Sequence, residues 1–437
     1  MPKLLPLLLC LIPATLLAQP QPREEWVLTT RVYGNLLHQR LWLEREGTRL
    51  RGSLDGDPLE GQSSERHLRF VVTARSGARY AYSATQHPDG LTGEADWPGT
   101  NDPKARVSHP FTARAVPMRP PGPPRHHDFE PTTFSNTFSA DLPPVLTLWP
   151  GDSVRTRTLD SGGVDAQGVT RALFGNPQTG PFYVGTAADG DTLVIHLKRL
   201  RLNRDTADSL DDLVGRAMGP RLAAKAHAQG LGKPIRWKLD RKRGIARPES
   251  PSPRMKDFTV PLRPMLGGLA VAPAFGFPPA STGDSGRFGG NMDFNELVEG
   301  NTVYLPVSQP GALLYLGDAH AAQGDGETSQ FALETSMEVE FAVDVLPGKS
   351  IATPRIESPT HIIALGQAGS LDDALRVATA GLTQWLEQDY GLSLSDCAQV
   401  LGTSAQFRVA NLAGRNVGVA ASLEKQRLAR LKPSPNP

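Results

Sequence analysis

The chain has 437 residues, and at about 150 residues per domain this length predicts two or more domains. Lysine and arginine number 46 against 45 aspartate and glutamate residues, so no excess charge exists to attract nucleic acid, which we do not expect as a partner. The 43 glycines and 39 prolines imply many turns and short elements, which excludes helical bundles and coiled coils.

The first 18 residues show the regions of a secretory signal peptide in their usual order. Lys3 supplies a positive charge, residues 4–17 form an apolar run, and Ala18 precedes a polar segment. A membrane-spanning helix is disfavoured because about 14 apolar residues fall short of the roughly 20 that span a bilayer. We therefore predict cleavage near Ala18 and a periplasmic or secreted protein without a membrane span. Cys397 would then be the single remaining cysteine, so no internal disulfide is expected.

Residues 24–116 alternate short apolar stretches, such as 68–72 and 80–82, with glycine-containing turns. This pattern predicts a small accessory domain of antiparallel strands that meander. Residues 117–125 contain five prolines and form a linker, because proline favours extended geometry and prevents regular pairing. A domain boundary is expected there.

Strand patterns continue after the linker, at residues 145–148, 153–159 and 192–197, and indicate a barrel or sandwich. Residues 205–254 change to an alanine-rich and basic composition, which predicts a partly helical insertion. A helix is expected from the N-cap Ser370 to Gly391, with an apolar stripe that begins at Leu371 and Leu375. A second helix should start at Ser393 or Ser395, and residues 426–437 should form a disordered tail.

The densest group of candidate functional side chains lies in residues 317–327. On a strand, Asp318 and His320 share a face, and Gly324 and Gly326 allow the backbone to fold back so that Glu327 approaches them. These residue types could bind a hard or borderline metal ion. The spacing matches no zinc motif, however, and a polar hairpin whose side chains cap backbone groups is the alternative.

Other loops carry further candidates. Gly290 and its neighbour Gly289 permit close approach of a ligand, and Asn291 with Asp293 place two oxygen-bearing side chains on one side of an extended segment. This segment could equally be a turn. Asp160 emerges at a strand end beside a flexible loop, where sites are commonly built. The pair 126–127, two histidines after the linker, is a secondary candidate, because adjacent histidines without further spaced ligands are weak evidence for a metal.

Several of these stretches, taken in order, resemble the acetamidase/formamidase family. They lie between about residues 129 and 425 and comprise 138–158, 175–184, 289–293, 304–307, 310–313, 317–327 and 353–357. The resemblance implies a mainly β fold for residues 126–425, with a β-sandwich or barrel core and a smaller α+β C-terminal portion. It also implies hydrolysis of short linear carboxamides to carboxylate and ammonia, and a divalent metal ion. Zinc is the favoured ion and calcium or another divalent ion the alternative.

The roles follow from the chemistry that amide hydrolysis requires: an activated water, a stabilised oxyanion and a proton for the leaving nitrogen. The predicted metal ligands are Asp160, Asp293 and His320; the predicted catalytic residues are Glu327 and Asp318; the predicted substrate-binding residues are Asn291 and Gly290. Glu327 is expected to act as base and then acid, or else as a fourth ligand.

The signal peptide, the N-terminal β segment and the insertion depart from the family pattern and leave the identity of the amide open. We expect a homo-oligomer, a dimer, with a small-molecule amide as substrate. The alternative function is a secreted, non-catalytic binding protein that reuses the fold, and intact Asp293, His320 and Glu327 favour the enzyme.

Overall fold

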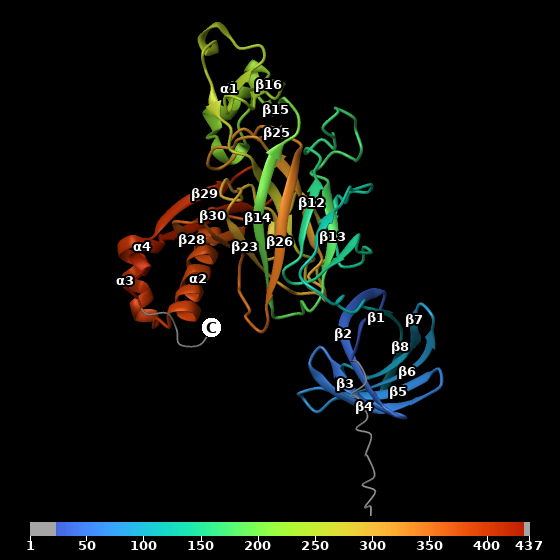
Figure 1. Ribbon diagram of the computed structural model, residues 1–437. Coiled ribbons are helices and arrows are strands. Elements are labelled where there is room, and N and C mark those ends of the chain that lie inside the picture. Colours follow the sequence, from blue (N-terminus) through green and yellow to red (C-terminus); the bar gives the residue numbers. More distant parts are fainter. Residues whose placement is uncertain (1–22, 432–437) are drawn as a thin grey trace, which may run out of the picture. The chain divides into compact units, whose positions relative to one another are not determined.

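The computed structural model describes residues 23–431 (Figure 1). The predicted signal peptide, residues 1–18, and residues 432–437 of the predicted tail lie outside this range. The chain divides into two compact units: residues up to Trp26 with Leu41–Ala115, and Val27–Arg40 with the chain from Val116 onward. Val27–Arg40 belongs to the second unit although it lies within the predicted 24–116 segment. Among the described residues, none of the helices has the length and apolar composition needed to cross a bilayer.

Eight antiparallel strands near the N-terminus form a closed barrel in which each strand pairs with its neighbour in sequence. The strands are β1 (Glu24–Val32), β2 (Asn35–Glu46), β3 (Arg49–Leu54), β4 (Asp57–Ser64), β5 (His67–Thr73), β6 (Arg79–His87), β7 (Gly90–Pro98) and β8 (Arg106–Ala115). Alternate side chains are buried, as strand geometry requires: Phe70 of β5 stacks on Tyr82 of β6 with ring centroids 4.9 Å apart. The predicted meander is therefore present, and it closes on itself.

Two larger sheets form the centre of the second unit. The first has 11 strands: β11 (Leu146–Leu148), β13 (Gln178–Val184), β15 (Thr206–Leu210), β16 (Pro234–Asp240), β17 (Ile245–Pro248), β18 (Val260–Pro261), β19 (Met265–Ala270), β21 (Ser285–Gly286), β22 (Gly289–Asn291), β24 (Leu314–His320) and β25 (Glu334–Thr335). The second has nine: β9 (His126–Asp128), β12 (Ser153–Arg157), β14 (Thr192–Leu202), β23 (Thr302–Pro306), β26 (Met337–Leu346), β27 (Arg355–Glu357), β28 (His361–Ala368), β29 (Gln406–Asn411) and β30 (Val417–Glu424). A small pair, β10 (Thr137–Phe138) and β20 (Ala280–Ser281), completes the strands.

The main hydrophobic core lies between these two sheets. Phe182 of β13 contacts Phe341 of β26 edge to face, with ring centroids 5.5 Å apart. The same cluster contains Leu266 and Leu316 from the first sheet and Ile195 from the second, all nearly inaccessible to solvent. Strands that are buried on an inner face and packed in this way form a β-sandwich. The expectation of a mainly β fold with a sandwich core is confirmed.

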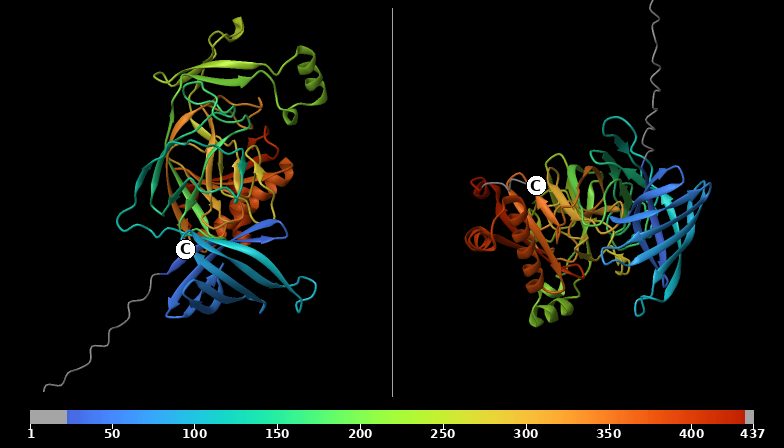
Figure 2. Two further views of the ribbon diagram at one scale, coloured as in Figure 1. Left: turned by 90° about the vertical axis from the view of Figure 1, so that its right-hand side faces the viewer. Right: turned by 90° about the horizontal axis from the view of Figure 1, so that it is seen from below.

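Helices α2 (Leu371–Tyr390) and α3 (Leu394–Ser404) form the C-terminal α+β portion with β28 and β30 (Figures 1 and 2). Ser370 caps α2 by accepting a hydrogen bond from the Asp373 N–H, as predicted. The buried stripe of α2 differs from the prediction at its start: Leu371 and Leu375 are exposed, because the face that meets the sheet begins at Ala374.

The predicted disordered tail is ordered at its beginning. Residues Lys425–Leu428 form the short helix α4, and Leu428 is buried in the C-terminal cluster because its side chain packs against that apolar layer. The insertion at 205–254 contains β15, β16 and β17 together with α1 (Pro220–Gln229) and the single 3-10 turns η1 (Gly215–Ala217) and η2 (Pro253–Met255). It extends one end of the 11-stranded sheet beyond β25.

Candidate active site

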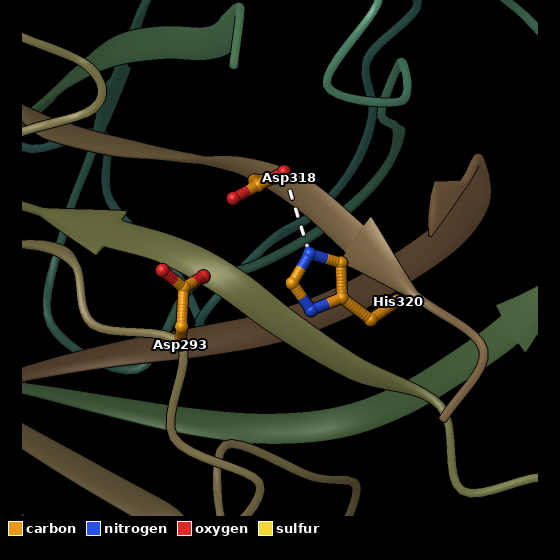
Figure 3. Close-up of side chains that lie close together, drawn as sticks. All are labelled: Asp293, Asp318 and His320. Atoms are coloured by element: carbon orange, nitrogen blue, oxygen red, sulfur yellow. Dashed lines mark ion pairs between the residues drawn. The ribbon is translucent and has the colours of Figure 1, made fainter. Parts of the chain in front are cut away.

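Five ionisable side chains converge in the interior of the second unit. Asp293 follows β22, Asp318 and His320 belong to β24, Glu327 lies in the next loop and Glu334 begins β25. Their ligand atoms fall into two groups, one of Asp293, Asp318 and His320 and one of His320, Glu327 and Glu334, within which all atoms lie no more than 4.8 Å apart. Figure 3 shows the Asp293 and Asp318 carboxylates turned toward the His320 ring.

Strand pairing brings the more distant residues together. His320 of β24 lies opposite Glu334 of β25 in antiparallel register, and its Nε2 is 3.2 Å from Glu334 Oε1 and 3.5 Å from Asp318 Oδ1. The backbone of Asp293, Asp318 and Glu327 is left-handed, with φ of 40°, 55° and 43°. This conformation costs a non-glycine residue roughly 1–3 kcal/mol and is concentrated at functional sites. The fold therefore holds these three carboxylates in place against a local energetic preference.

Gly267 on β19 provides the space that the two aspartates occupy. A Cβ at this position would lie 2.6 Å from Asp293 Oδ1 and 2.6 Å from Asp318 Oδ2. Atoms at this separation overlap, so any larger residue would displace the carboxylates. Glycine is needed here for close approach rather than for its backbone angles.

Four buried atoms of the cluster make no hydrogen bond of adequate geometry among the described residues, although His320 Nε2 lies in ion-pair contact with Glu334 and Asp318. They are Asp293 Oδ1, Asp318 Oδ1, His320 Nε2 and Glu334 Oε2. An unsatisfied buried polar atom costs about 1–3 kcal/mol, and more when it is charged. Native proteins satisfy nearly all such atoms, and three of these four belong to Asp293, Asp318 and His320, which form one group that could hold an ion. One nitrogen and three carboxylate oxygens form a donor set that suits a divalent cation.

Burial and mutual repulsion shift the proton affinities of the cluster. Burial, followed by the negative charge of Asp318, raises the pKa of Asp293 to about 8. Burial also raises the pKa of Glu334, and burial together with the Asp293 carboxylate places the pKa of Glu327 well above its usual range. Burial lowers the pKa of His320, but the carboxylates of Glu334 and Asp318 outweigh it, so the net shift is strongly upward.

Three asparagines hold the two aspartates in place. The Asn176 amide donates to Asn291 Oδ1 at 2.7 Å and to Asp318 Oδ2 at 3.0 Å. Asp293 Oδ2 accepts hydrogen bonds from Asn291 and, at 2.7 Å, from the Asn411 amide. Each aspartate thus has one oxygen fixed by amide groups, while the other oxygen is among the unpartnered atoms.

Gln323 determines which nitrogen of His320 can bind an ion. Its amide nitrogen donates to the Asp293 backbone carbonyl, which leaves its Oε1 facing His320 Nδ1 at 2.8 Å. Because Oε1 can only accept, Nδ1 must carry the proton in the neutral ring. The lone pair of the neutral ring is then on Nε2, which faces the carboxylates. Such an outer hydrogen bond is the usual means of orienting a metal-binding histidine.

Two of the predicted site residues lie elsewhere. Asp160 is outside both groups: its Oδ2 accepts from Arg204 Nη2 at 2.6 Å, and this ion pair supplies the positive charge that a metal ion would otherwise provide. Gly290 pairs with Leu269 in the sheet next to Asn291, without a contact to the cluster among those described. The two histidines 126 and 127 lie on the edge strand β9, where they contact Ser153 and Asp152.

Several residues that shape the site were not predicted from the sequence, namely Glu334, Asn176, Gln323, Asn411 and Gly267. Glu334 approaches His320 only through the register of β24 with β25, a non-local pairing that residue patterns do not reveal. Asn176 and Asn411 could have been found from the sequence, because Asn176 directly follows Gly175 and Asn411 precedes Gly414 by three residues, and glycine-containing loops often approach a ligand.

Residues 274–384, which contain all five ionisable residues of the cluster, match the Acetamidase/Formamidase family. A protein of Schizosaccharomyces pombe named as a formamidase is 56% identical over 75 residues, which is 17% of this chain and 18% of that protein. The match thus spans less than a fifth of the curated relative.

Solved structures cover more of the chain. The acetamidase of Yersinia enterocolitica is 28% identical with a TM-score of 0.60, over 70% of this chain and 94% of that chain. An acetamidase/formamidase structure from Thermoanaerobacter tengcongensis, 22% identical, shares the fold with a TM-score of 0.60 over 70% of this chain and 98% of that one. The resemblance seen in the sequence motifs is confirmed: residues 274–384 match the acetamidase/formamidase family, and solved structures of acetamidase fold cover 70% of the chain.

Proposed function

We propose that this protein is an exported amide hydrolase that uses a divalent metal ion, with zinc favoured, to convert short linear carboxamides to carboxylate and ammonia. The match of residues 274–384 to the acetamidase/formamidase family, and the similarity of the fold to an acetamidase, support amide hydrolysis. The observation that carries metal dependence is the set of four buried ligand atoms without hydrogen-bond partners in the described chain. Export rests on the order of charged, apolar and small residues in the first 18 positions.

The residues present fit such an ion. Asp293, Asp318 and His320 would hold it, and Glu334 Oε2 is a candidate fourth ligand. When bound, a divalent ion supplies Lewis-acid polarisation of the amide carbonyl and lowers the pKa of water. Its positive charge would also stabilise the carboxylates in their ionised form, reversing the upward pKa shift of Asp293.

Glu327 is the residue that would move protons. Burial and the Asp293 carboxylate raise its pKa well above the usual range, so in its ionised form it is a stronger base than an exposed carboxylate and can take up a proton from the attacking water and later donate it to the leaving nitrogen. Its Oε1 accepts a hydrogen bond from the Ala332 N–H at 3.1 Å, which fixes the side chain in the loop. The amide nitrogen needs this proton because an amide anion is a very poor leaving group.

The enclosure of the cluster supports a small substrate. Asp293, Asp318 and His320 are each 1% exposed, and Glu327 is 6% exposed. A large acyl group could not reach these side chains without a rearrangement of the surrounding loops. Formamide and acetamide are therefore the first substrates to test. The low exposure also keeps bulk water away from the charges, which strengthens their interactions.

The test is ammonia release by the purified mature protein, measured with formamide, acetamide and propionamide before and after removal of metal by a chelator. We expect release that stops on chelation and returns with zinc. An H320A variant should lose both metal and activity. Ammonia release that is unaffected by complete metal removal would refute metal dependence, and metal binding without release from any amide would favour the binding-protein alternative.

Export and assembly are tested separately. N-terminal sequencing of the protein recovered from the periplasm or medium should begin just after Ala18. Full-length protein confined to the cytoplasm would contradict export. The expected homodimer stays a prediction that analytical ultracentrifugation can decide.

A further inference from the structure

One guanidinium group joins the two loops that carry Asp293 and Glu327. Arg408 lies on β29, and its Nη1 is 2.9 Å from Glu296 Oε1. Its Nη2 donates to Asn295 Oδ1 at 2.7 Å, and its Cζ lies 5.3 Å from the centroid of the Phe294 ring. Arg408 therefore contacts each of the three residues that follow Asp293 in the chain.

The same side chain holds the second loop. Arg408 Nε donates to Asp325 Oδ2 at 2.9 Å, and Nη2 also contacts Asp325 Oδ1, so the carboxylate is bound by two nitrogens. Asp325 precedes Glu327 by two residues. The two loops are also linked directly, because the Asn295 amide donates to Asp325 Oδ1 at 2.9 Å.

Backbone hydrogen bonds attach the second loop to the strand from which Arg408 projects. The Gly326 N–H donates to the Ala410 carbonyl at 3.2 Å, and the Leu412 N–H donates to the Gly326 carbonyl at 2.8 Å. Gly326, the residue before Glu327, is therefore hydrogen-bonded on both its N–H and its carbonyl to residues 410 and 412, close to Arg408 in the chain. Movement of the guanidinium would be transmitted to Glu327 over a very short length of chain.

These contacts favour a role in positioning over a role in stability. The Arg408 side chain is 33% exposed and that of Asp325 is 46% exposed, and ion pairs with such exposure contribute little to folding. A planar, forked group that binds acceptors on two segments nevertheless fixes their separation. Catalytic groups must be held within about 0.5 Å of their productive geometry, so this separation matters for the site.

We propose that Arg408 is a positioning residue that sets the distance between Asp293 and Glu327, and thereby determines metal affinity and turnover. The proposal rests on the proposed function of the same cluster. If this is correct, removing the guanidinium of Arg408 should impair the geometry of the metal ligands and proton transfer by Glu327 while leaving the β-sandwich intact.

The test compares R408Q and R408K with R263Q as a matched control. Arg263 also binds Glu296, with Nη2 2.7 Å from Oε2, but its side chain has no described hydrogen bond to the loop of Asp325; its backbone N–H donates to the Ala321 carbonyl, a bond that R263Q retains. Zinc dissociation constants are measured on the metal-free proteins by competition with a chromophoric chelator, together with kcat and KM for acetamide. Hydrogen exchange of residues 321–333 follows the mobility of the loop directly.

We expect R408Q to weaken zinc binding by about 10-fold or more and to lower kcat by about 10- to 100-fold, with KM nearly unchanged, because misplaced catalytic groups impair turnover on this scale. R408K should recover only part of the loss, since a lysine cannot reproduce the fork. R263Q should behave as the parent protein, and only the Arg408 variants should show faster exchange in residues 321–333.

Wild-type zinc affinity and kcat in R408Q, with a small loss of thermal stability equal to that of R263Q, would overturn the proposal. Failure of the proposed function looks different, because the parent protein itself would release no ammonia. In that case zinc affinity and hydrogen exchange still decide the role of Arg408: selective weakening in R408Q supports it, and unchanged values refute it.

Discussion

Replacement of Gly267 by alanine tests the geometry of the cluster with the smallest possible change. The added Cβ would lie 2.6 Å from Asp293 Oδ1 and 2.6 Å from Asp318 Oδ2, whereas real Cβ contacts essentially never fall below 3.0 Å. Each oxygen must therefore move by at least the difference, about 0.4 Å, if the backbone stays in place. Metal sites tolerate deviations of about 0.2 Å in ligand distance, so the displacement is about twice what binding allows.

We therefore expect G267A to weaken zinc binding by about 100-fold or more, and to lose about 1–3 kcal/mol in the free energy of unfolding, the usual cost of overpacking. Zinc affinity is measured by chelator competition and stability by chemical denaturation. The neighbouring G268A is a control of the same size, because the three atoms nearest its Cβ all belong to the Gln178 side chain, at 2.5–2.9 Å, and Gln178 reaches Asp318 only through Asn176. G268A should lose stability but retain zinc. Wild-type zinc affinity in folded G267A would refute the assignment of the two aspartates.

Three further predictions concern the other members of the cluster. H320A should lose metal, whereas E327Q should keep metal and fold while turnover falls by roughly 10²-fold or more, the scale typical of proton-transfer groups; equal metal loss in both would show that Glu327 is a ligand. Q323A should weaken zinc binding by about 10- to 100-fold, because it removes the acceptor that orients His320; unchanged affinity would show that the ring needs no such partner. In the metal-free protein, Asp293 has a folded pKa of about 8, above its unfolded value, so the folded state binds more protons and stability should decrease as the pH rises from about 4 to 8. The pKa values of Glu334 and His320 are also raised, so their contributions to stability decrease with rising pH as well. Thermal unfolding at several pH values, with and without zinc, should show that zinc removes this decrease. A metal-free protein that gains stability between about pH 4 and 8 would contradict the prediction.

The residue types and turn patterns were sufficient to predict the mainly β fold, the Ser370 cap and the convergence of Asp318, His320 and Glu327, all of which depend on short separations along the chain. Asp293 was also predicted as a ligand, because consecutive glycines precede it and its side chain shares one side of the segment with Asn291. The sequence could not show that Asp160 forms an ion pair instead of binding a metal ion, because its partner Arg204 is 44 residues away and becomes a neighbour only in the folded sheets.

Other features depend on pairings that no local pattern encodes. The closure of β1 against β8 joins strands from the two ends of residues 24–115, and Glu334 reaches His320 through strand register. The buried stripe of α2 was misjudged at Leu371 and Leu375 because the direction in which the helix crosses β28 decides which side of its first turn is covered. In each case the determining contact is tertiary.

Anomalous diffraction at the zinc edge, from crystals of the zinc-loaded mature protein, tests the central claim most directly. We predict a peak bounded by Asp293, Asp318 and His320, with His320 Nε2 and a carboxylate oxygen from each aspartate at about 2.0–2.2 Å from the ion. A cluster without a peak, in crystals that carry zinc elsewhere or not at all, would contradict the account. A peak at Asp160 would do the same, because it would require Arg204 to leave its ion pair.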